Sequence, residues 1–438
     1  MDPSGAETTS AEAAKGTFTK APMRDARVRG HRVLVRADLN VPLSGHSVSD
    51  DARIRAALPT IEYLRDADAS VVLCSHLGRP EDRDPDLSMS PVAARLAELL
   101  GIGVAVAPGV VGGAVEAAAA GLEPGEVLLL ENTRYEPGET KNDPELADGL
   151  AALADIYVND AFGAAHRAHA STAGVAEHLP AYAGLLLERE VRELTSVLAD
   201  PARPLVVVLG GAKVSDKIGV IERFLEIADE ILIGGAMCFS FFRAQGQETG
   251  DSLVEEEGIE LARTALERAE ASGCELRLPV DLVAGDKFAA DAERRKIDGV
   301  EIEPGWIGLD VGSKTAASYV DAIAQAGTVF WNGPMGAFEM EPFSHGTRAI
   351  AEAVAASDAV TIVGGGDSGA ALGQFGLADQ VSWLSTGGGA SLALIEGKKL
   401  PGVEALLDAD ERTGGPGKAG SSSNAAPAER HLRRGPGE

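Results

Sequence analysis

Two lysines four residues apart follow a buried strand in the middle of the chain. Residues 205–209 are all apolar and lead into two glycines, which predicts a parallel strand that ends in a tight turn. The apolar periodicity from Ile218 onward predicts a helix whose first turns carry Lys213 and Lys217. Two ammonium groups on one face of a helix start, beside free backbone N–H groups, suit a chain of phosphates. The alternative is a pair of solvated surface lysines.

Polar side chains also follow the strands predicted in the first half of the chain. The ligand crevice of an open parallel sheet lies outside the carboxyl ends of its strands, so these side chains should gather at one rim. Arginine makes bidentate contacts to phosphate and carboxylate groups, and the pattern therefore predicts an anion site. Arginines scattered over the surface are the alternative. The residues expected at the rim are Asp38, Asn40, Arg53, His76, Arg79, Arg134 and Arg167.

A glycine-rich turn lies between a predicted strand and a predicted helix near residue 364. Gly364, Gly366 and Gly369 fit the spacing G-x-G-x-x-G, a weak signal for dinucleotide binding when it stands alone. Asp367 lies inside this turn. Its carboxylate would repel a phosphate unless a cation such as Mg²⁺ lay between them. The turn therefore favours a metal-bound nucleotide phosphate.

The histidines and cysteines do not show the spacing of a zinc site. Cys74 and His76 share a strand face, and His166 and His169 are three residues apart, but further ligands at fixed spacing are missing. His169 and His178 are predicted to be ordinary hydrogen-bonded histidines.

Strands and helices alternate along most of the chain. This rhythm, with abundant alanine and glycine, predicts an α/β fold with two domains. Tyr182–Leu198 predicts a long helix that joins them and acts as a hinge element. The expected organisation is a disordered extension (1–16), a substrate domain (17–182), the interdomain helix (183–200), a nucleotide domain (201–384), a C-terminal segment that returns towards the hinge and first domain (385–408), and a disordered tail (409–438).

The composition excludes several classes of function. With 67 acidic and 39 basic residues, the net charge is −28, which argues against nucleic-acid binding and against anionic membranes. The acidic excess is spread along the chain and suits a high-salt cytoplasm, although an ordinary acidic protein is the alternative. Three distant cysteines predict no disulfide framework, which fits the reducing cytoplasm. The N-terminus shows no signal peptide pattern, and no apolar run is long enough to span a bilayer.

Together these motifs resemble the phosphoglycerate kinase family. The resemblance covers about residues 17–408. It is carried by RADLNVP (36–42), RIRAALPTI (53–61), SHLGRP (75–80), LLENTRY (129–135), VNDAFGAAHRAH (158–169), GGAKVSDK (210–217), WNGPMGAFE (331–339), GGGDSG (364–369) and STGGGASLALIEGKKLPGV (385–403). It implies two doubly wound, Rossmann-like parallel-sheet domains joined by the interdomain helix, with the active site in the cleft between them.

The resemblance also implies roles for particular residues. The rim residues named above would bind 3-phosphoglycerate or 1,3-bisphosphoglycerate. Arg53, Lys213, Gly365 and Gly388 would be catalytic, with Lys213 meeting the transferred phosphoryl group and Lys217 lying deeper on the nucleotide phosphates. Asp367 would hold Mg²⁺. The implied nucleotide-binding residues are Gly211, Lys213, Lys217, Gly234, Gly235, Asn332, Pro334, Glu339, Gly364, Gly365, Gly366, Asp367 and Ser368.

The implied activity is reversible, Mg²⁺-dependent phosphoryl transfer from 1,3-bisphosphoglycerate to ADP, by a cytoplasmic monomer from a halophilic archaeon. Two departures from the family pattern affect local structure: Ser313 replaces a common proline at a helix start, and Trp383 replaces a common histidine near the last strand. A nicotinamide-dependent dehydrogenase and a non-catalytic nucleotide-binding protein are the competing hypotheses. The first rests on the glycine fingerprint alone, and the second would lack the arginine rim.

Overall fold

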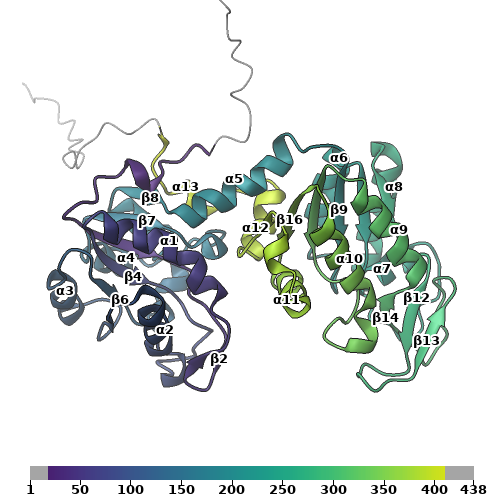
Figure 1. Cartoon of the computed structure of the whole chain (residues 1–438), viewed down its shortest axis with the longest axis horizontal. Helices are drawn as coiled ribbons and strands as arrows, with labels where there is room; N and C mark the ends of the chain where they lie inside the picture. Colours follow the sequence, from purple (N-terminus) through teal and green to yellow (C-terminus); the bar gives the residue numbers. More distant parts are fainter. Residues whose placement is uncertain (1–17, 410–438) are drawn as a thin grey trace, which may run out of the picture.

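The computed structural model describes residues 18–409, which form two lobes joined by a single helix, α5 (Leu185–Ala199) (Figure 1). Each lobe has a parallel sheet covered by helices on both faces, so the predicted α/β fold is confirmed. The predicted N-terminal extension, and the predicted tail from residue 410 onward, lie outside the described residues.

The first lobe contains a six-stranded sheet in the order β5-β6-β4-β1-β7-β8, in which every pairing is parallel. The strands are β1 (Arg32–Arg36), β4 (Ser70–Cys74), β5 (Val104–Val106), β6 (Val127–Leu129), β7 (Ile156–Asn159) and β8 (Ala181–Ala183). The helices are α1 (Ala52–Asp66), α2 (Ser90–Leu100), α3 (Gly113–Ala120) and α4 (Pro144–Ala151). A short hairpin, β2 (Leu43–Ser44) and β3 (Ser47–Val48), precedes α1.

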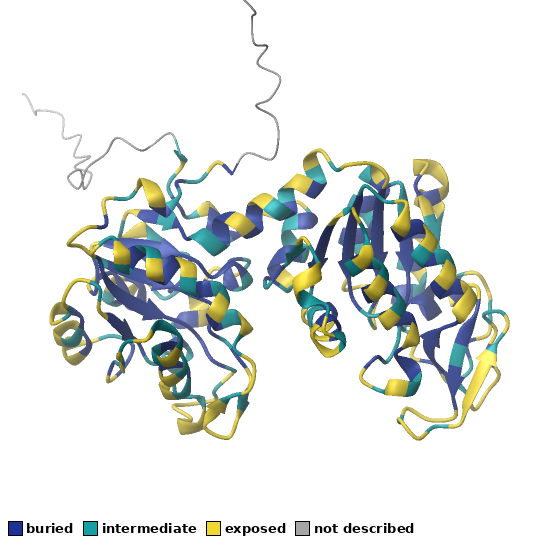
Figure 2. Ribbon diagram, in the orientation of Figure 1, coloured by how far each residue is buried: buried dark blue, intermediate teal, exposed yellow. Residues whose placement is uncertain are grey.

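Successive residues of β1 pack against opposite layers of helices, as the period of two in a strand requires. Val33 and Val35 belong to the core formed with α1 and α2, whereas Leu34 belongs to the core formed with α3 and α4. Both faces are apolar because both are covered, which explains the continuous apolar runs in the sequence. Figure 2 shows these strands as buried ribbons between partly exposed helices.

The second lobe repeats this architecture with the order β11-β10-β9-β15-β16-β17. Its strands are β9 (Leu205–Leu209), β10 (Glu230–Ile233), β11 (Glu275–Arg277), β15 (Thr328–Asn332), β16 (Val360–Gly364) and β17 (Trp383–Leu384). Its helices are α6 (Ile218–Ile227), α7 (Met237–Ala244), α8 (Gly258–Ser272), α9 (Ser313–Ala324), α10 (His345–Ala356) and α11 (Gly366–Phe375). α6, α7 and α8 pack on one face of the sheet, and α9, α10 and α11 on the other.

In each sheet the chain builds outward from a central strand on one side and then returns to build on the other side. The reversal falls between β1 and β7 in the first lobe and between β9 and β15 in the second. Such switch points open a crevice at the carboxyl ends of the strands, where ligands bind in open α/β sheets. The topology therefore locates one candidate site in each lobe.

The sequence did not predict the small antiparallel sheet of the second lobe. It has the order β13-β12-β14, with β12 (Leu282–Gly285), β13 (Arg294–Ile297) and β14 (Ile307–Val311). Three helix starts also differ from the prediction: the first lysine helix, the helix expected from Leu253 and the interdomain helix begin later, at Ile218, Gly258 and Leu185. By contrast, α9 begins at Ser313 without the family's proline.

The end of the described chain runs back from the second lobe to the first. α12 (Gly389–Ile395) contacts α5 and α6, and α13 (Pro401–Glu404) follows it. The backbone N–H of Gly402 donates to the carbonyl oxygen of Ala165 at 2.9 Å, and Lys20 forms an ion pair with Asp408 at 2.9 Å. In Figure 1 these C-terminal segments lie beside α5.

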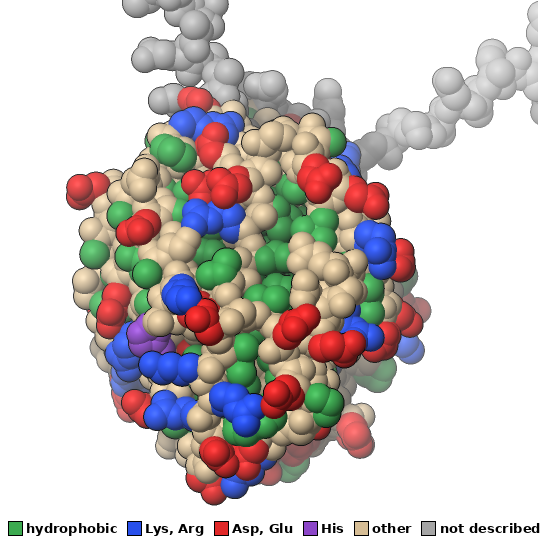
Figure 3. Space-filling view, turned by 90° about the vertical axis from the view of Figure 1, so that its right-hand side faces the viewer, with side chains coloured by type: hydrophobic (Ala, Val, Ile, Leu, Met, Phe, Trp, Pro, Cys, Tyr) green, Lys and Arg blue, Asp and Glu red, His purple; other side chains and the backbone are tan. Residues whose placement is uncertain are grey.

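Within residues 18–409, no helix has the length and apolar character needed to cross a membrane. The acidic side chains on the face drawn in Figure 3 are scattered rather than gathered into one patch. This distribution agrees with the even spread of acidic residues along the sequence.

Candidate active site

A basic cavity of about 300 Å³ lies at the carboxyl ends of the strands of the first lobe. All seven residues that the sequence predicted for the rim line it, together with Arg36, His166, His169 and the backbone of 387–389. The strand ends bring them together because parallel strands end at one edge of the sheet. Arg79 and Arg167 are exposed, whereas His76 and Asp38 are largely buried.

Arg53 lies in the first turn of α1 and reaches over the cavity from that helix. Its Nη1 atom lies 3.1 Å from the Oδ2 atom of Asp38 and 3.2 Å from the carbonyl oxygen of Asn40. The Arg53 side chain remains 37% exposed, so its charge is available to a ligand. Asp38 thus holds the guanidinium at the edge of the cavity.

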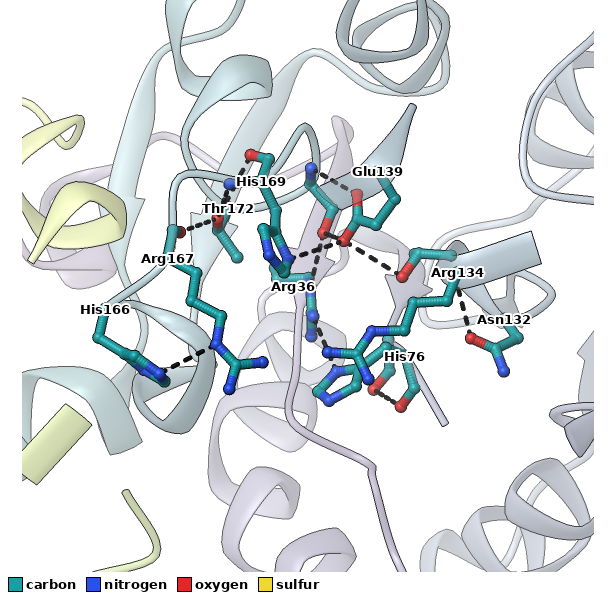
Figure 4. A network of polar contacts seen from close by, with 12 residues as sticks. Arg36, His76, Asn132, Arg134, Glu139, His166, Arg167, His169 and Thr172 are labelled. Carbon is teal, nitrogen blue, oxygen red and sulfur yellow. Dashed lines mark hydrogen bonds and ion pairs between the residues drawn. The ribbon is translucent and has the colours of Figure 1, made fainter. Parts of the chain in front are cut away.

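Behind the cavity lies a buried network of polar side chains (Figure 4). Arg36, at the end of β1, is fully buried, and its Nη2 atom lies 3.1 Å from Nδ1 of His76. Its Nε atom donates to the hydroxyl of Ser171 at 2.8 Å, and that hydroxyl donates to the buried carboxylate of Glu139 at 2.6 Å. His169 Nδ1 lies 3.7 Å from the same carboxylate.

The electrostatics of the cavity favour an anion. Burial lowers the pKa of His76 well below its usual value, and the neighbouring Arg36, Arg134 and Arg53 lower it further. Burial also lowers the pKa of Arg134, and the charges of nearby arginines add to this effect. Cations packed so closely repel one another, and a bound anion relieves that repulsion.

The sequence reasoning missed several residues of this cavity. His169 was predicted to be an ordinary histidine, but it lines the cavity, so that prediction was wrong. Arg36 was missed because it lies inside a strand, although it begins the motif RADLNVP. Glu139 follows a loop, and only the fold brings it next to Ser171. Spacing along the chain contained no signal for that last contact.

A second, apolar cavity of about 540 Å³ lies in the other lobe. It extends from the turn after β9 to β14 and to the loop after β15. Gly211, Gly235, Pro334, Glu339 and Asp367 line it, as the resemblance implied. The apolar wall itself was not predicted, and it is formed by Cys238, Phe239, Leu253, Leu282, Phe288, Ile307, Leu309, Val311 and Met335.

Two of the predicted glycines are needed for close packing of the backbone. A Cβ atom on Gly235 would lie 2.5 Å from the backbone nitrogen of Gly211, and Gly235 has a φ of +66°. A Cβ atom on Gly234 would lie 2.4 Å from the sulfur of Met335. Gly234 does not line the cavity. Its absent side chain allows the turn after β10 to pack against the loop after β15.

Lys213 and Lys217 do not share a helix face, so this prediction was wrong. α6 begins at Ile218, Lys217 is its N-cap residue, and Lys213 lies in the preceding turn. Lys213 is exposed. Lys217 is partly buried and its ammonium group donates to the side-chain oxygen of Asn332 at the end of β15. The amide nitrogen of Asn332 donates to the carbonyl oxygen of Gly364 at 2.8 Å.

The glycine-rich turn before α11 leaves Asp367 exposed in the first turn of that helix. Gly365 has a φ of +95°, which a side chain would strain. Gly364 ends β16, and Gly366 is exposed at the start of α11. The hydroxyl of Ser368 is buried and accepts a hydrogen bond from the backbone N–H of Gly333 at 2.6 Å, so it ties this turn to the loop after β15.

The segment between the lobes that carries Gly388 is held by α5. Glu190 is fully buried and accepts hydrogen bonds from the indole N–H of Trp383 at 3.0 Å and from the backbone N–H of Thr386 at 2.7 Å. Gly388 has a φ of +51° and lines the basic cavity. A residue of the connecting helix therefore positions a wall of the site.

Two α/β lobes, one with a basic cavity and one with an apolar cavity beside a glycine-rich helix start, are typical of a two-domain kinase. A family model described as phosphoglycerate kinase matches residues 23–398. The chain belongs to the phosphoglycerate kinase family.

Individual proteins agree with this assignment. The chain is 55% identical over 395 residues to the phosphoglycerate kinase of Roseiflexus castenholzii, which covers 90% of this chain and 100% of that protein. It is 55% identical over 392 residues to that of Moorella thermoacetica, covering 89% and 100%.

Solved structures agree as well. The phosphoglycerate kinase of Coxiella burnetii has a TM-score of 0.79 at 43% identity, covering 88% of this chain and 98% of that one. That of Pyrococcus horikoshii has a TM-score of 0.80 at 33% identity, covering 90% and 100%.

Proposed function

We propose that this chain transfers a phosphoryl group reversibly from 1,3-bisphosphoglycerate to ADP, giving 3-phosphoglycerate and ATP. The observation that carries the proposal is the basic cavity, which gathers all seven residues expected for an anionic substrate. The second cavity supplies a separate place for a nucleotide.

The basic cavity would take the phosphoglycerate. Arg79 and Arg167 are exposed at its edge and suit the phosphate that stays on the substrate. Arg53 and the backbone of 387–389 lie where the reacting carboxyl end would meet the second lobe. His76 and Asn40 lie between them in the cavity wall and would orient the ligand.

The apolar cavity would take the adenine base. Leu253 and Phe288 are 60% and 70% exposed, unusual for large apolar residues, and both line this cavity. A bound purine would cover them, which favours binding through the hydrophobic effect. Glu339 would contact the ribose. The phosphates would then lie towards Lys217 and the first turn of α11, where free backbone N–H groups favour an anion.

The residues present fit a magnesium ion bound with the nucleotide. The described residues hold no group of three or more acidic, histidine or cysteine side chains that could bind a metal by themselves. Mg²⁺ commonly uses one or two carboxylates together with substrate phosphates, so exposed Asp367 at the phosphate end is suitable. Bound there, Mg²⁺ would neutralise phosphate charge.

The transfer requires no nucleophile from the protein, because the terminal oxygen of ADP attacks the acyl phosphate. The protein must align donor and acceptor and neutralise charge on the phosphoryl group. Arg53 of the first lobe and Lys213 of the second would do this, with Gly365 and Gly388 allowing close backbone approach. The two cavities share no lining residue, so the lobes must approach each other for transfer. Closure would also exclude water.

We further propose a cytoplasmic, monomeric enzyme adapted to high salt. The three cysteines are unpaired and buried, which fits a reducing compartment, and the net charge is −28. Gel filtration tests the monomer, and activity measured from low to molar KCl tests the salt adaptation. The archaeal origin remains a prediction.

A coupled assay tests the activity. The protein is mixed with 3-phosphoglycerate and MgATP, and the acyl phosphate formed is reduced by an added NADH-dependent dehydrogenase. Loss of NADH absorbance is expected only with all components present. No turnover at either low or molar salt would contradict the proposed function. Binding of NADH to the protein alone, measured by fluorescence, would favour the dehydrogenase hypothesis.

The affinity for ADP should depend on pH through Lys217. Burial lowers the pKa of Lys217 to about 8, although the carboxylates of Asp216, Asp367 and Glu396 oppose the shift. A polyanion binds the charged ammonium better than the neutral amine. The KM for ADP should therefore be lowest below pH 8 and rise about tenfold as the pH increases well past 8, since a charge-assisted contact is worth about 1.5 kcal/mol.

Lys217→Arg should remove this rise, because arginine stays charged throughout the range. Lys399→Arg, at a lysine that is 85% exposed, is the matched control and should keep the rise. The measurement is the KM for ADP at a series of pH values. The same rise in Lys217→Arg as in the unmodified protein would exclude Lys217 as its source.

A further inference from the structure

Glu139 is a fully buried carboxylate behind the basic cavity, and it does not line that cavity. It lies in the short helix η4 (Glu139–Lys141). Its Oε2 atom accepts from the backbone N–H of Ser171 at 3.0 Å, and its Oε1 atom accepts from the Ser171 hydroxyl at 2.6 Å. A buried carboxylate with such specific partners is costly to keep unless it serves a purpose.

Its contacts continue to the cavity wall through Ser171 and Arg36. The Ser171 hydroxyl donates to Glu139 and accepts from Nε of Arg36 at 2.8 Å. The other end of the same guanidinium reaches His76, with 3.1 Å between Nη2 and Nδ1. Nη1 donates to the carbonyl oxygen of Ala37 at 2.5 Å, which fixes the plane of the group. Glu139, Ser171, Arg36 and His76 are called the buried relay below.

The chemistry of arginine decides which nitrogen of His76 carries the proton. A guanidinium only donates hydrogen bonds, so Nδ1 of His76 must accept and must be unprotonated. In the neutral ring the proton is then on Nε2. Burial and the surrounding cations lower the pKa of His76 well below its usual value, so the ring stays neutral near pH 7. His76 therefore offers the cavity a hydrogen-bond donor.

We propose that Glu139 is a positioning residue for substrate binding: through Ser171 and Arg36 it holds His76 in the tautomer whose Nε2–H donates to the anionic ligand. This inference rests on the proposed phosphoglycerate site. Without the carboxylate, nothing fixes the Ser171 hydroxyl as an acceptor for Arg36. Arg36 can then turn away, and Nδ1 of His76 is free to take the proton.

Glu139 also supports the loop that carries Arg167. Its backbone carbonyl accepts from the N–H of Ala170 at 2.9 Å, and its carboxylate lies 3.7 Å from Nδ1 of His169. A purely structural role would therefore also affect binding. The tautomer of His76 separates the two, because loss of loop order alone leaves the contact between Arg36 and His76 intact.

The test uses Glu139→Gln and Ser171→Ala in the full chain. Long-range ¹H–¹⁵N spectra show which ring nitrogen of a histidine is protonated, and His76→Asn assigns the signals of His76 among the eight histidines. The unmodified protein should show His76 with its proton on Nε2. Both variants should show a mixture of tautomers and a KM for 3-phosphoglycerate about tenfold higher, which corresponds to about 1.4 kcal/mol. kcat and the KM for MgATP should stay within about twofold, because only ground-state binding is lost.

Glu136→Gln is the matched control, since Glu136 is a nearby glutamate whose ion pair with Arg83 lies at the surface. It should change neither the tautomer nor the KM. A proton on Nδ1 of His76 in the unmodified protein overturns the proposal. So does an unchanged tautomer and KM in Ser171→Ala, which also decides the question if Glu139→Gln fails to fold. The spectrum of the unmodified protein requires no turnover, so failure of the proposed activity is a separate result.

Discussion

Replacing Arg53 by alanine is expected to lower kcat by about a thousandfold or more and to leave the affinity for ADP nearly unchanged. An arginine that neutralises a transferring phosphoryl group contributes on this scale in other kinases and GTPases. Arg53 lies at the edge of the basic cavity, 3.1 Å from Asp38, and the apolar cavity of the second lobe does not include it. The rate constant comes from the coupled assay and the affinity for ADP from calorimetry.

Arg55→Ala is the control for this experiment. Arg55 lies on the same helix, but its ion pair with Asp51 faces the surface, so the substitution should leave kcat within about twofold. Circular dichroism must show that Arg53→Ala is folded, because the change leaves the carboxylate of Asp38 without its partner. If ADP affinity fell by as much as the rate, Arg53 would not be acting on the phosphoryl group.

Replacing Glu190 by alanine is expected to destabilise the contact between α5 and the segment after β17 by about 3 kcal/mol. The change leaves the donors of Trp383 and Thr386 without an acceptor in a buried site, and each such loss costs about 1–3 kcal/mol. Burial raises the pKa of Glu190, although its hydrogen bonds oppose that shift. Calorimetry should show a lower melting temperature. Activity should also fall, because the same segment places Gly388 against the basic cavity.

Glu193→Ala provides the comparison on the same helix. Glu193 is 37% exposed and lies 3.7 Å from Arg189, so its loss should cost less than about 1 kcal/mol. Equal melting temperatures for the two variants would show that the buried carboxylate does not stabilise this junction. Glu190→Gln keeps an acceptor oxygen and should lie between the two.

The Trp383 contact explains how this chain accommodates a residue that departs from the family pattern. The indole N–H donates to Glu190, and the guanidinium of Arg189 lies over the ring at 4.3 Å from its centroid. A cation over an indole ring is a favourable contact. The interdomain junction therefore keeps a hydrogen bond to α5 with a different donor.

The alternation of strands and helices, and the rim of the basic cavity, could be predicted from the chain alone. Parallel strands buried on both faces appear as continuous apolar runs, and their carboxyl ends meet at one edge whatever the details of packing. Asp38, His76, Arg134 and Arg167 were therefore placed correctly at one cavity from local patterns. Helix starts were less predictable, as the turn at Lys213 shows, because loop conformation depends on distant contacts.

The buried relay and the apolar cavity depend on tertiary structure. Ser171 is 32 residues from Glu139, and Arg36 is 40 residues from His76 along the chain. The wall of the apolar cavity combines side chains from α7, β12 and β14. Apolar side chains lining a ligand cavity have the same sequence pattern as core side chains. The local sequence could thus predict which residues end the strands, whereas packing of the lobes decided which buried groups stand behind them, because those contacts join segments that no local periodicity connects.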